Sequence, residues 1–233
     1  MPTLTYQARR GELHEYFDRT AMRAWERLTS DAPVSGIRAT VRAGRDAMRG
    51  TLLSWLPADL QGLRLLDAGC GTGALAIEAA QRGADVVAVD IAPALVQLAR
   101  NRAAAAGVAE RIVFGEGDML DPAHGRFDHV VAMDSLIHYR PEDTVRVLAG
   151  LAARTTRSML FTFAPRTPLL AAMHAAGRFF PRGDRAPSIV PVAEAGLRRL
   201  IAGEPAMEGW APGRDRRIAS GFYTSHALEL VRR

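Results

Sequence analysis

Two acidic residues flank a run of three glycines, and together these residues could bind a nucleotide. The run Asp-Ala-Gly-Cys-Gly-Thr-Gly occupies residues 67–73, and Asp90 ends the next apolar stretch. Gly69, Gly71 and Gly73 would let the backbone turn tightly and approach a ligand closely. Asp90 could accept hydrogen bonds from both hydroxyls of a ribose. The spacing therefore predicts a nucleotide site between the two acids.

The position of Asp67 distinguishes between two kinds of nucleotide. Gly69-x-Gly71-x-x-Ala74 satisfies the dinucleotide pattern, so NAD is an alternative on pattern alone. A carboxylate two residues before the first glycine would repel a pyrophosphate, but it would attract the sulfonium and ammonium groups of S-adenosylmethionine. We therefore predict S-adenosylmethionine as the cosubstrate, ahead of NAD. A glycine turn without a ligand is disfavoured, because three glycines between two acids have no packing purpose.

Two further stretches offer contacts to such a cofactor. Cys70 lies inside the glycine turn, and we interpret it as a small residue beside the ligand rather than a catalytic thiol. Asp118 and Met119 follow a short apolar run. Asp118 could accept a hydrogen bond from the adenine amine, with Met119 against the ring face. A solvated loop aspartate is the alternative interpretation of Asp118.

Alternating strands and helices must position these residues. Apolar runs predict strands at residues 63–68, 86–89, 111–114, 127–133, 158–164, 207–220 and 222–231. Helical spacing predicts helices at residues 74–80, 93–106, 142–153, 167–180 and 192–201. This alternation is typical of an α/β domain, whose ligands bind at the carboxyl ends of parallel strands.

The first 60 residues precede the glycine motif and are predicted to be helical. Glu12–Phe17 and Met22–Leu28 carry apolar residues at helical spacing, and a third helix runs from about Ile37 to Leu56. The third helix places apolar residues on one side and arginines elsewhere. We expect this N-terminal segment to be a lid over the carboxyl edge of the sheet. Packing against one sheet face is the alternative.

Composition limits the class of protein. The chain has 233 residues, 48% of them hydrophobic and 24% charged, which suits one soluble α/β domain with additions. There is neither an apolar run of about 20 residues nor a signal peptide, so we expect a cytosolic protein, with weak membrane attachment left open. The 30 basic residues are all arginine and are spread along the chain, which argues against nucleic acid as a partner.

Catalytic and substrate-binding groups are expected after the fourth and fifth strands. His138 lies just past the fourth strand and could act as a base for a phenol or amine acceptor, or simply cap a helix. A carboxylate acceptor would need only an orienting hydrogen-bond donor. The segment from 165 to about 190, with an arginine-rich loop at 181–187, could form one wall of a substrate pocket. The histidines show no metal-ligand spacing, so we predict no protein-bound metal.

Several stretches resemble one enzyme family. Residues 67–73 are similar to motif I of class I S-adenosylmethionine-dependent methyltransferases. Residues 15–17, 133–139, 161–168 and 220–223 resemble magnesium-protoporphyrin IX methyltransferases of bacteriochlorophyll and chlorophyll synthesis, of the purple-bacterial type. The resemblance spans nearly the whole chain. It implies a Rossmann-like methyltransferase domain over residues 61–233, with a mixed seven-stranded sheet and helices on both faces, after an N-terminal helical arm at 1–60.

The resemblance also implies a reaction and residue roles. The reaction is methylation of a propionate of magnesium protoporphyrin IX to the monomethyl ester. Tyr16 and His138 would assist the transfer. The expected cofactor contacts, with Ile91 included beside Asp90, are Asp67, Gly69, Cys70, Gly71, Gly73, Asp90, Ile91, Asp118, Met119 and Met133. A dianionic macrocycle suits an apolar cleft with arginines at its mouth, so Arg166, Arg182 and Tyr139 are the expected substrate contacts. A magnesium chelatase subunit is a candidate partner.

Other functions stay open at this level. The same cofactor site could serve a methyltransferase for another small acid, a quinone precursor or RNA. The chain could also be a non-catalytic porphyrin carrier or chelatase accessory protein, although such a carrier would need neither the glycines nor both acids. The sequence leaves undecided which propionate reacts, how magnesium is recognised and what the oligomeric state is.

Overall fold

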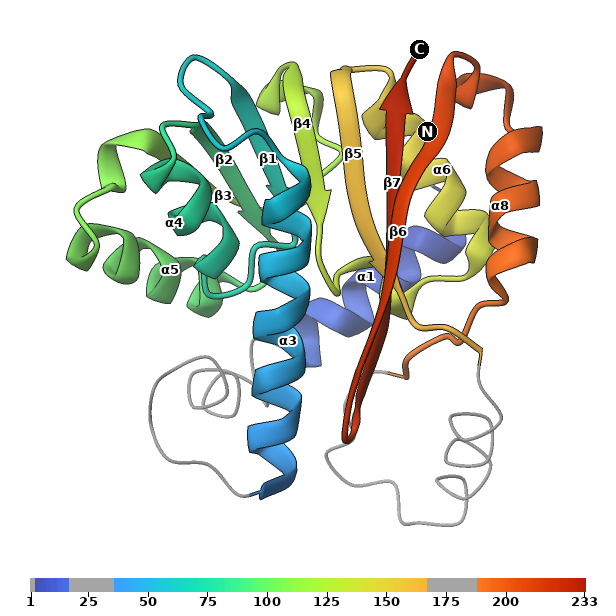
Figure 1. Cartoon of the computed structure of the whole chain (residues 1–233), viewed down its shortest axis with the longest axis horizontal. Coiled ribbons are helices and arrows are strands. Elements are labelled where there is room, and N and C mark those ends of the chain that lie inside the picture. The colour runs from blue at the N-terminus through green and yellow to red at the C-terminus, as the bar shows by residue number, and fades with distance from the viewer. Residues whose placement is uncertain (1–2, 17–35, 167–187) are drawn as a thin grey trace.

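A mixed sheet of seven strands forms the centre of the protein, and a computed structural model describes residues 3–16, 36–166 and 188–233 (Figure 1). The strands are β1 (Arg64–Ala68), β2 (Asp85–Asp90), β3 (Ile112–Glu116), β4 (Phe127–Ala132), β5 (Thr155–Phe163), β6 (Trp210–Ser220) and β7 (Tyr223–Arg232). Their order across the sheet is β3-β2-β1-β4-β5-β7-β6. The predicted mixed seven-stranded sheet is therefore confirmed.

The direction of strand order changes between β1 and β4. β1 pairs in parallel with both β2 and β4, so that Leu66 lies opposite Val87 on one side and Val130 on the other. β7 pairs antiparallel with both β5 and β6. In an open α/β sheet, a ligand binds outside the carboxyl ends of the strands at such a reversal. The end of β1, where the glycine motif begins, lies at this point.

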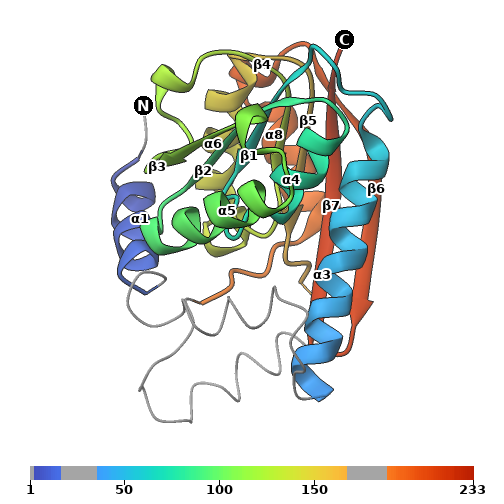
Figure 2. The same cartoon turned by 90° about the vertical axis from the view of Figure 1, so that its left-hand side faces the viewer.

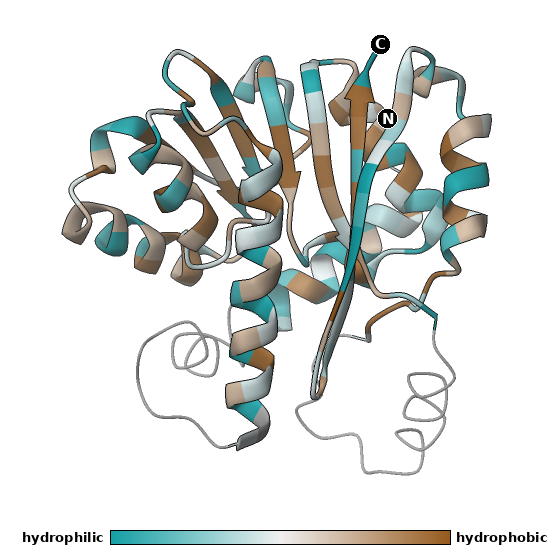
Figure 3. Cartoon of the chain, in the orientation of Figure 1, coloured by the Kyte–Doolittle hydropathy of each residue, from teal (hydrophilic) through white to brown (hydrophobic). Residues whose placement is uncertain are grey.

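Helices cover both faces of the sheet because its inner strands are apolar on both sides (Figures 1 and 2). One face carries α3 (Gly36–Trp55), α4 (Ala74–Gln81) and α5 (Pro93–Ala105). The other carries α6 (Pro141–Ala152) and α8 (Glu194–Gly203). Short 3₁₀ helices lie at Ala109–Arg111, Pro122–His124, Leu136–His138 and Pro205–Met207. Figure 3 shows the hydrophobic residues concentrated on the inner strands and on the helix sides that meet them.

The N-terminal segment takes both of the positions considered from the sequence. α1 (Leu4–Tyr16) buries Tyr6 and Leu13 in the same hydrophobic cluster as Leu136 and Tyr139, next to the carboxyl ends of the strands. α3 instead packs against β6, β7 and α4, and buries Met48 and neighbouring residues on that side. α1 thus lies near the carboxyl ends of the strands and α3 on a sheet face, and the role of the segment as a lid stays a prediction. The domain boundary at residue 60 stays a prediction.

The observed elements follow the predicted ones, with shifted ends. α1 begins at Leu4 rather than near Glu12, because Thr3 Oγ1 accepts a hydrogen bond from Tyr6 N (3.0 Å) and donates one to Asp143. β5 begins at Thr155 rather than Ser158, and β6 begins at Trp210 after a 3₁₀ turn. The helices predicted at 22–28 and 167–180 and the loop predicted at 181–187 lie outside the described residues.

The exposed edge strand β6 is hydrophilic over much of its length (Figure 3). Its exposed stretch, residues 212–217, contains three arginines and one acid, namely Arg214, Asp215, Arg216 and Arg217. Arg214 is held in place by ion pairing with Glu229 of β7. Charged side chains on an edge strand discourage pairing with another chain.

α3 approaches the β6–β7 hairpin so closely that glycine is needed at the contact. A Cβ atom at Gly44 would lie 2.4 Å from Tyr223 Cδ1, and one at Gly221 would lie 2.5 Å from Thr40 Oγ1. Tyr223 cannot turn away freely, because its hydroxyl is hydrogen bonded to Asp134. These contacts fix the distance between α3 and the hairpin.

Two of the glycines in α3, Gly44 and Gly50, allow a matched test of this packing. We expect Gly44→Ala to lower the free energy of unfolding by about 1–3 kcal/mol, because the added methyl group overpacks the contact with Tyr223. Gly50→Ala meets no atom within 4 Å and should raise it by about 0.5–1 kcal/mol through helix propensity. Chemical denaturation of both variants measures the difference. Equal effects of the two substitutions would contradict the close contact.

Candidate functional site

A cleft opens at the carboxyl ends of β1, β2 and β4, beside the reversal in strand order. Polar and charged residues from several elements line it, namely Arg42, Arg45, Asp46, Arg49, Asp67, Thr72, Asp90, Asp134, Ser135 and His138. Aromatic and apolar residues complete the lining, among them Tyr6, Leu13, Leu75, Ile91, Met119, Met133 and Tyr139. The cleft thus joins an acidic strand edge to an arginine-bearing helix and an aromatic wall.

Asp90 holds the glycine turn in its shape. Its Oδ2 accepts a hydrogen bond from Gly71 N at 2.8 Å, and its Oδ1 accepts one from Ala92 N at 3.0 Å. Burial raises the pKa of Asp90, although these two backbone donors lower it in part. The carboxylate therefore organises the turn while it lines the cleft.

Asp67 is a buried carboxyl group at the end of β1. Its Oδ2 accepts one hydrogen bond, from Ala76 N in the first turn of α4, at 3.1 Å. Burial and the nearby charge of Asp90 raise the pKa of Asp67 to about 7. A cation bound beside the two carboxyl groups would stabilise their ionised forms.

The three glycines of the turn serve different purposes. Gly71 has φ +52° and open space around its Cβ position, on the lining of the cleft. A Cβ at Gly69 would lie 2.3 Å from Ser135 Cβ, and one at Gly73 would lie 2.8 Å from Ala99 Cβ. Gly71 is therefore the position that lets a ligand approach. Gly69 and Gly73 allow packing of the protein itself, so the expectation that the glycines have no packing purpose is wrong for these two.

Cys70 is buried in the turn, and its environment does not favour a thiolate. Burial, together with the charges of Asp90 and Asp67, raises the pKa of its thiol. The thiol form is consistent with a small residue beside the ligand, as the sequence suggests.

The segment after β4 begins with a residue in an unusual conformation. Asp134 has φ +53°, the one non-glycine residue of the described chain with a positive φ. Its backbone N–H donates to Thr162 Oγ1 at 2.7 Å. Ser135 Oγ then donates to Ala68 O at 2.7 Å, which brings the segment over the glycine turn. This conformation directs the 3₁₀ helix Leu136–His138 along the cleft.

His138 is mostly buried beside the cleft, and burial lowers its pKa to about 4. Its Nδ1 lies 3.4 Å from the carbonyl oxygen of Ser188, and the positive charge of Arg9 opposes protonation as well. The imidazole is therefore neutral at physiological pH. It can exchange hydrogen bonds with a ligand, but it carries no charge.

α1 is anchored over one end of the cleft. Tyr6 OH donates to Asp118 Oδ1 at 2.8 Å, and its ring stacks on Tyr139 with 5.0 Å between centroids. Arg10 pairs with the other oxygen of Asp118, and Arg9 Nε donates to His138 O at 3.0 Å. Asp118 thus binds α1 in this structure, and its predicted contact with adenine stays a prediction.

The structure brings together most, but not all, of the residues predicted for the site. The cleft lining contains Asp67, Gly69, Cys70, Gly71, Asp90, Ile91, Met119, Met133, His138 and Tyr139. Among the described residues, Gly73, Asp118, Tyr16 and Arg166 do not belong to that lining, and Arg182 lies outside the described chain. Tyr16 is the half-buried last residue of α1, and Arg166 is exposed. The individual roles of all these residues stay predictions.

Sequence reasoning missed two groups of lining residues. Tyr6 precedes the stretch that was interpreted as the first helix, so it was not considered. Arg42, Arg45 and Arg49 were assigned to the side of the third helix away from its apolar residues, without a function. Their spacing of three and four residues places them on one side of a helix, which was the available signal.

Two histidines distant from the glycine turn have specific surroundings. Glu194, Asp215 and His226 bring their ligand atoms within 4.8 Å of one another, although they are far apart in sequence. Arg198 already binds both acids, at 2.8 and 3.2 Å.

His129 is buried in β4, and its Nδ1 lies 2.8 Å from Ser158 Oγ, whereas its Nε2 has no partner among the described residues.

Comparison with known proteins relates this cleft to methyltransferases. Residues 132–232 match the family model described as the magnesium-protoporphyrin IX methyltransferase C-terminus, and residues 65–157 match a methyltransferase domain. A magnesium-protoporphyrin O-methyltransferase of Rhodobacter capsulatus is 49% identical, over 96% of this chain and 97% of that protein. A protein of the same name from Synechocystis is 30% identical, over 94% and 95%.

A solved structure agrees with these relatives. The magnesium protoporphyrin IX methyltransferase from Synechocystis, crystallised with bound SAH, superposes with a TM-score of 0.84 at 30% identity. The match covers 96% of this chain and 99% of that one. The present chain therefore has the class I methyltransferase fold, and its cosubstrate is S-adenosylmethionine. Buried Asp67 and half-buried Asp90, beside the open turn at Gly71, suit this cationic ligand.

The raised pKa of Asp67 makes cofactor binding sensitive to pH. Below pH 7 the carboxyl group is increasingly protonated and loses its attraction for a cation. We expect the affinity for S-adenosylmethionine to fall by up to about ten-fold per pH unit below 7 and to level off above it. Calorimetric titrations between pH 5.5 and 8.5 measure this, with Asp67→Asn as the control. An identical pH dependence in that variant would rule out Asp67 as its cause.

Proposed function

This chain belongs to the magnesium-protoporphyrin IX methyltransferase family, and from that premise we propose how its cleft esterifies a propionate carboxylate of magnesium protoporphyrin IX. The observation that carries the proposal is that one cleft contains both an acidic region and a region lined by aromatic residues and arginines. Asp67 and Asp90 provide an acidic strand edge for the cofactor. Tyr6, Tyr139 and the arginines of α3 provide an aromatic and cationic region for an anionic macrocycle.

The acidic strand edge contributes to the reaction by positioning the cofactor. S-adenosylmethionine supplies a methyl group on a positively charged sulfur, which a nucleophile displaces in line. Asp67 offers a carboxylate to the cationic part of the cofactor, and Asp90 keeps the turn at Gly71 open to it. Holding two reactants at short distance in the correct orientation can supply much of the rate acceleration.

The acceptor needs no strong base. A propionate is already ionised at neutral pH, because an ordinary carboxyl group has a pKa near 4. The neutral imidazole of His138 fits this requirement, since it can orient a ligand without removing a proton. Tyr16 is retained as an assisting residue by the family resemblance alone. We propose that His138 positions the acceptor carboxylate by donating from Nε2–H, in the tautomer that gives up the 3.4 Å contact of Nδ1 with Ser188 O.

Apolar side chains limit the access of water to the reacting groups. Tyr6 and Leu13 of α1 and Tyr139 beside η4 (Leu136–His138) line the cleft and bury most of their own surface. The stacked rings of Tyr6 and Tyr139 are almost fully buried, so they contribute an aromatic part of the cleft wall rather than an open ring face. Exclusion of water strengthens the electrostatic interactions within the site.

Partners and location are proposed on separate grounds. Among the described helices, none combines the length and hydrophobicity needed to cross a membrane. We propose a cytoplasmic protein that touches the membrane surface, for which the exposed Phe222 at the turn between β6 and β7 is a candidate contact. A magnesium chelatase subunit is proposed as the donor of substrate. Sedimentation with anionic vesicles and co-purification of the two proteins would test these two points.

Methyl transfer itself gives the direct test. Purified protein incubated with methyl-labelled S-adenosylmethionine and magnesium protoporphyrin IX should form a singly labelled porphyrin whose label is released by alkaline ester hydrolysis. Porphyrin binding without transfer would instead support a carrier. Transfer to a quinone precursor in preference to the porphyrin would support the other enzymatic alternative, and equal transfer to metal-free porphyrin would contradict specificity for the magnesium complex.

The lowered pKa of His138 predicts a particular pH profile. With cofactor saturating, kcat/KM for the porphyrin should show no inflection near pH 6.5 and should decline toward pH 4, where His138 becomes protonated. His138→Gln should lower kcat/KM at neutral pH. It should also remove the part of the decline at low pH that is due to protonation of the imidazole. An inflection near 6.5 that disappears in the variant would show that His138 titrates as an exposed histidine and acts through a different protonation state.

A further inference from the structure

α3 presents a cationic side to the cleft. Arg42, Arg45 and Arg49 lie on successive turns of this helix and all line the cleft, together with one acid of the same helix, Asp46. Asp134 and Glu78, from other elements, pair with Arg45 and Arg49, so these ion pairs are balanced in charge. What α3 brings to the cleft is a set of guanidinium groups whose N–H donors suit a carboxylate.

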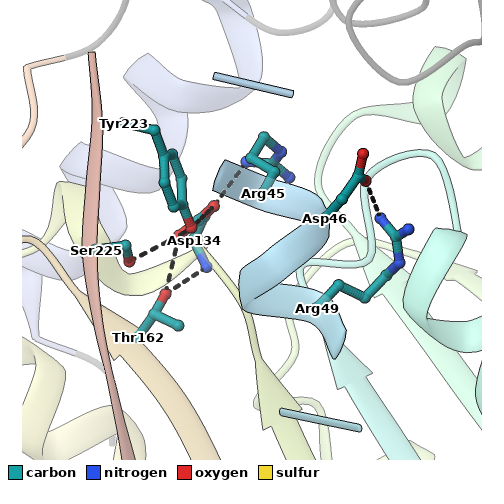
Figure 4. Close-up of polar contacts among 7 residues, drawn as sticks. All are labelled: Arg45, Asp46, Arg49, Asp134, Thr162, Tyr223 and Ser225. Atoms are coloured by element: carbon teal, nitrogen blue, oxygen red, sulfur yellow. Dashed lines mark hydrogen bonds and ion pairs between the residues drawn. The ribbon is translucent and has the colours of Figure 1, made fainter. Parts of the chain in front are cut away.

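Two of these arginines are held in defined positions. Arg49 binds Asp46 on its own helix, at 2.8 Å, and Glu78 of α4. Arg45 Nη1 binds Asp134 Oδ2 at 2.8 Å, and both groups are largely buried (Figure 4). A guanidinium held by a buried partner loses less conformational entropy when it binds a ligand.

Asp134 is suited to orienting Arg45 in the cleft. Its carboxylate accepts hydrogen bonds from the hydroxyl groups of Thr162, Ser225 and Tyr223, at 3.1 Å in each case (Figure 4). Three neutral donors therefore hold this carboxylate in addition to Arg45. The guanidinium has five N–H donors in a planar fork and can engage more than one carboxylate.

We propose that Arg42 and Arg45 form a carboxylate subsite in the cleft, with Asp134 and Tyr223 as the residues that position Arg45. The inference rests on the proposed function, because each of the two ligands in that reaction carries a carboxylate that does not react. These are the second propionate of the porphyrin and the amino acid carboxylate of the cofactor. Of the arginines predicted from sequence, Arg166 is exposed and outside the cleft lining.

Direct binding measurements test the subsite without depending on turnover. Magnesium protoporphyrin IX and its dimethyl ester are titrated into the full-length wild type, Arg42→Gln and Arg45→Gln, and S-adenosylhomocysteine is titrated separately. If the second propionate is the ligand, both variants should bind the diacid about 10- to 100-fold more weakly and the diester nearly unchanged. If the cofactor carboxylate is the ligand, the loss should appear with S-adenosylhomocysteine instead.

Matched variants separate binding from folding. Arg38→Gln removes the same charge from an exposed position on α3 and should leave all three affinities unchanged. Tyr223→Phe keeps the ring against Gly44 but removes one donor to Asp134, so it should give a smaller loss for the same ligand as Arg45→Gln. If Arg45→Gln does not fold, Arg42→Gln and Tyr223→Phe still decide the outcome.

Two results would overturn the proposal. One is unchanged binding of every ligand in Arg42→Gln and Arg45→Gln. The other is an equal loss for the diacid and the diester with unchanged binding of S-adenosylhomocysteine, which would indicate altered shape rather than a lost carboxylate contact. Failure of the wild type to methylate the porphyrin would count against the proposed function alone, because the titration with S-adenosylhomocysteine still tests the subsite.

Discussion

Two carboxyl groups lie at the ends of neighbouring parallel strands, Asp67 buried and Asp90 half-buried, and the rest of the site depends on how they are accommodated. A buried carboxylate is costly unless hydrogen bonds or an opposite charge compensate it. Ala76 N, at the start of α4, supplies one hydrogen bond to Asp67. Gly71 N and Ala92 N supply two to Asp90. A bound cationic cofactor adds to this compensation for Asp67, which fits the placement of the acid in a ligand cleft.

The compensation also explains the local architecture. Gly71 N can point at Asp90 because the turn between β1 and α4 adopts backbone angles that favour glycine. Ser135 closes over the same turn because Asp134 reverses the chain after β4. The turn and the segment after β4 are thus mutually dependent, and the glycine at position 69 is the space that allows their contact.

A second node links the two ends of the chain. Asp134 contacts α3 through Arg45, β5 through Thr162, and β7 through Tyr223 and Ser225. The C-terminal hairpin therefore helps to position a side chain that α3 contributes to the cleft. Tight packing of Tyr223 against Gly44 reinforces that position. This node is remote in sequence from the glycine motif, yet it forms the opposite wall of the same cleft.

The sequence by itself determined the fold class, the cofactor and the family. Local periodicity predicted the strands and the helices between them, and the spacing of Asp67, the glycines and Asp90 predicted the cofactor site, because these residues act within one continuous βαβ unit. The arginines of α3 were predicted as a helix side without a function, and Arg166 was expected at the substrate. Only the tertiary structure placed Arg42 and Arg45 in the cleft, Asp118 against α1, and Asp134 beside Tyr223. Contacts between residues about 90 positions apart depend on how the helices pack on the sheet, and this packing cannot be predicted from local periodicity.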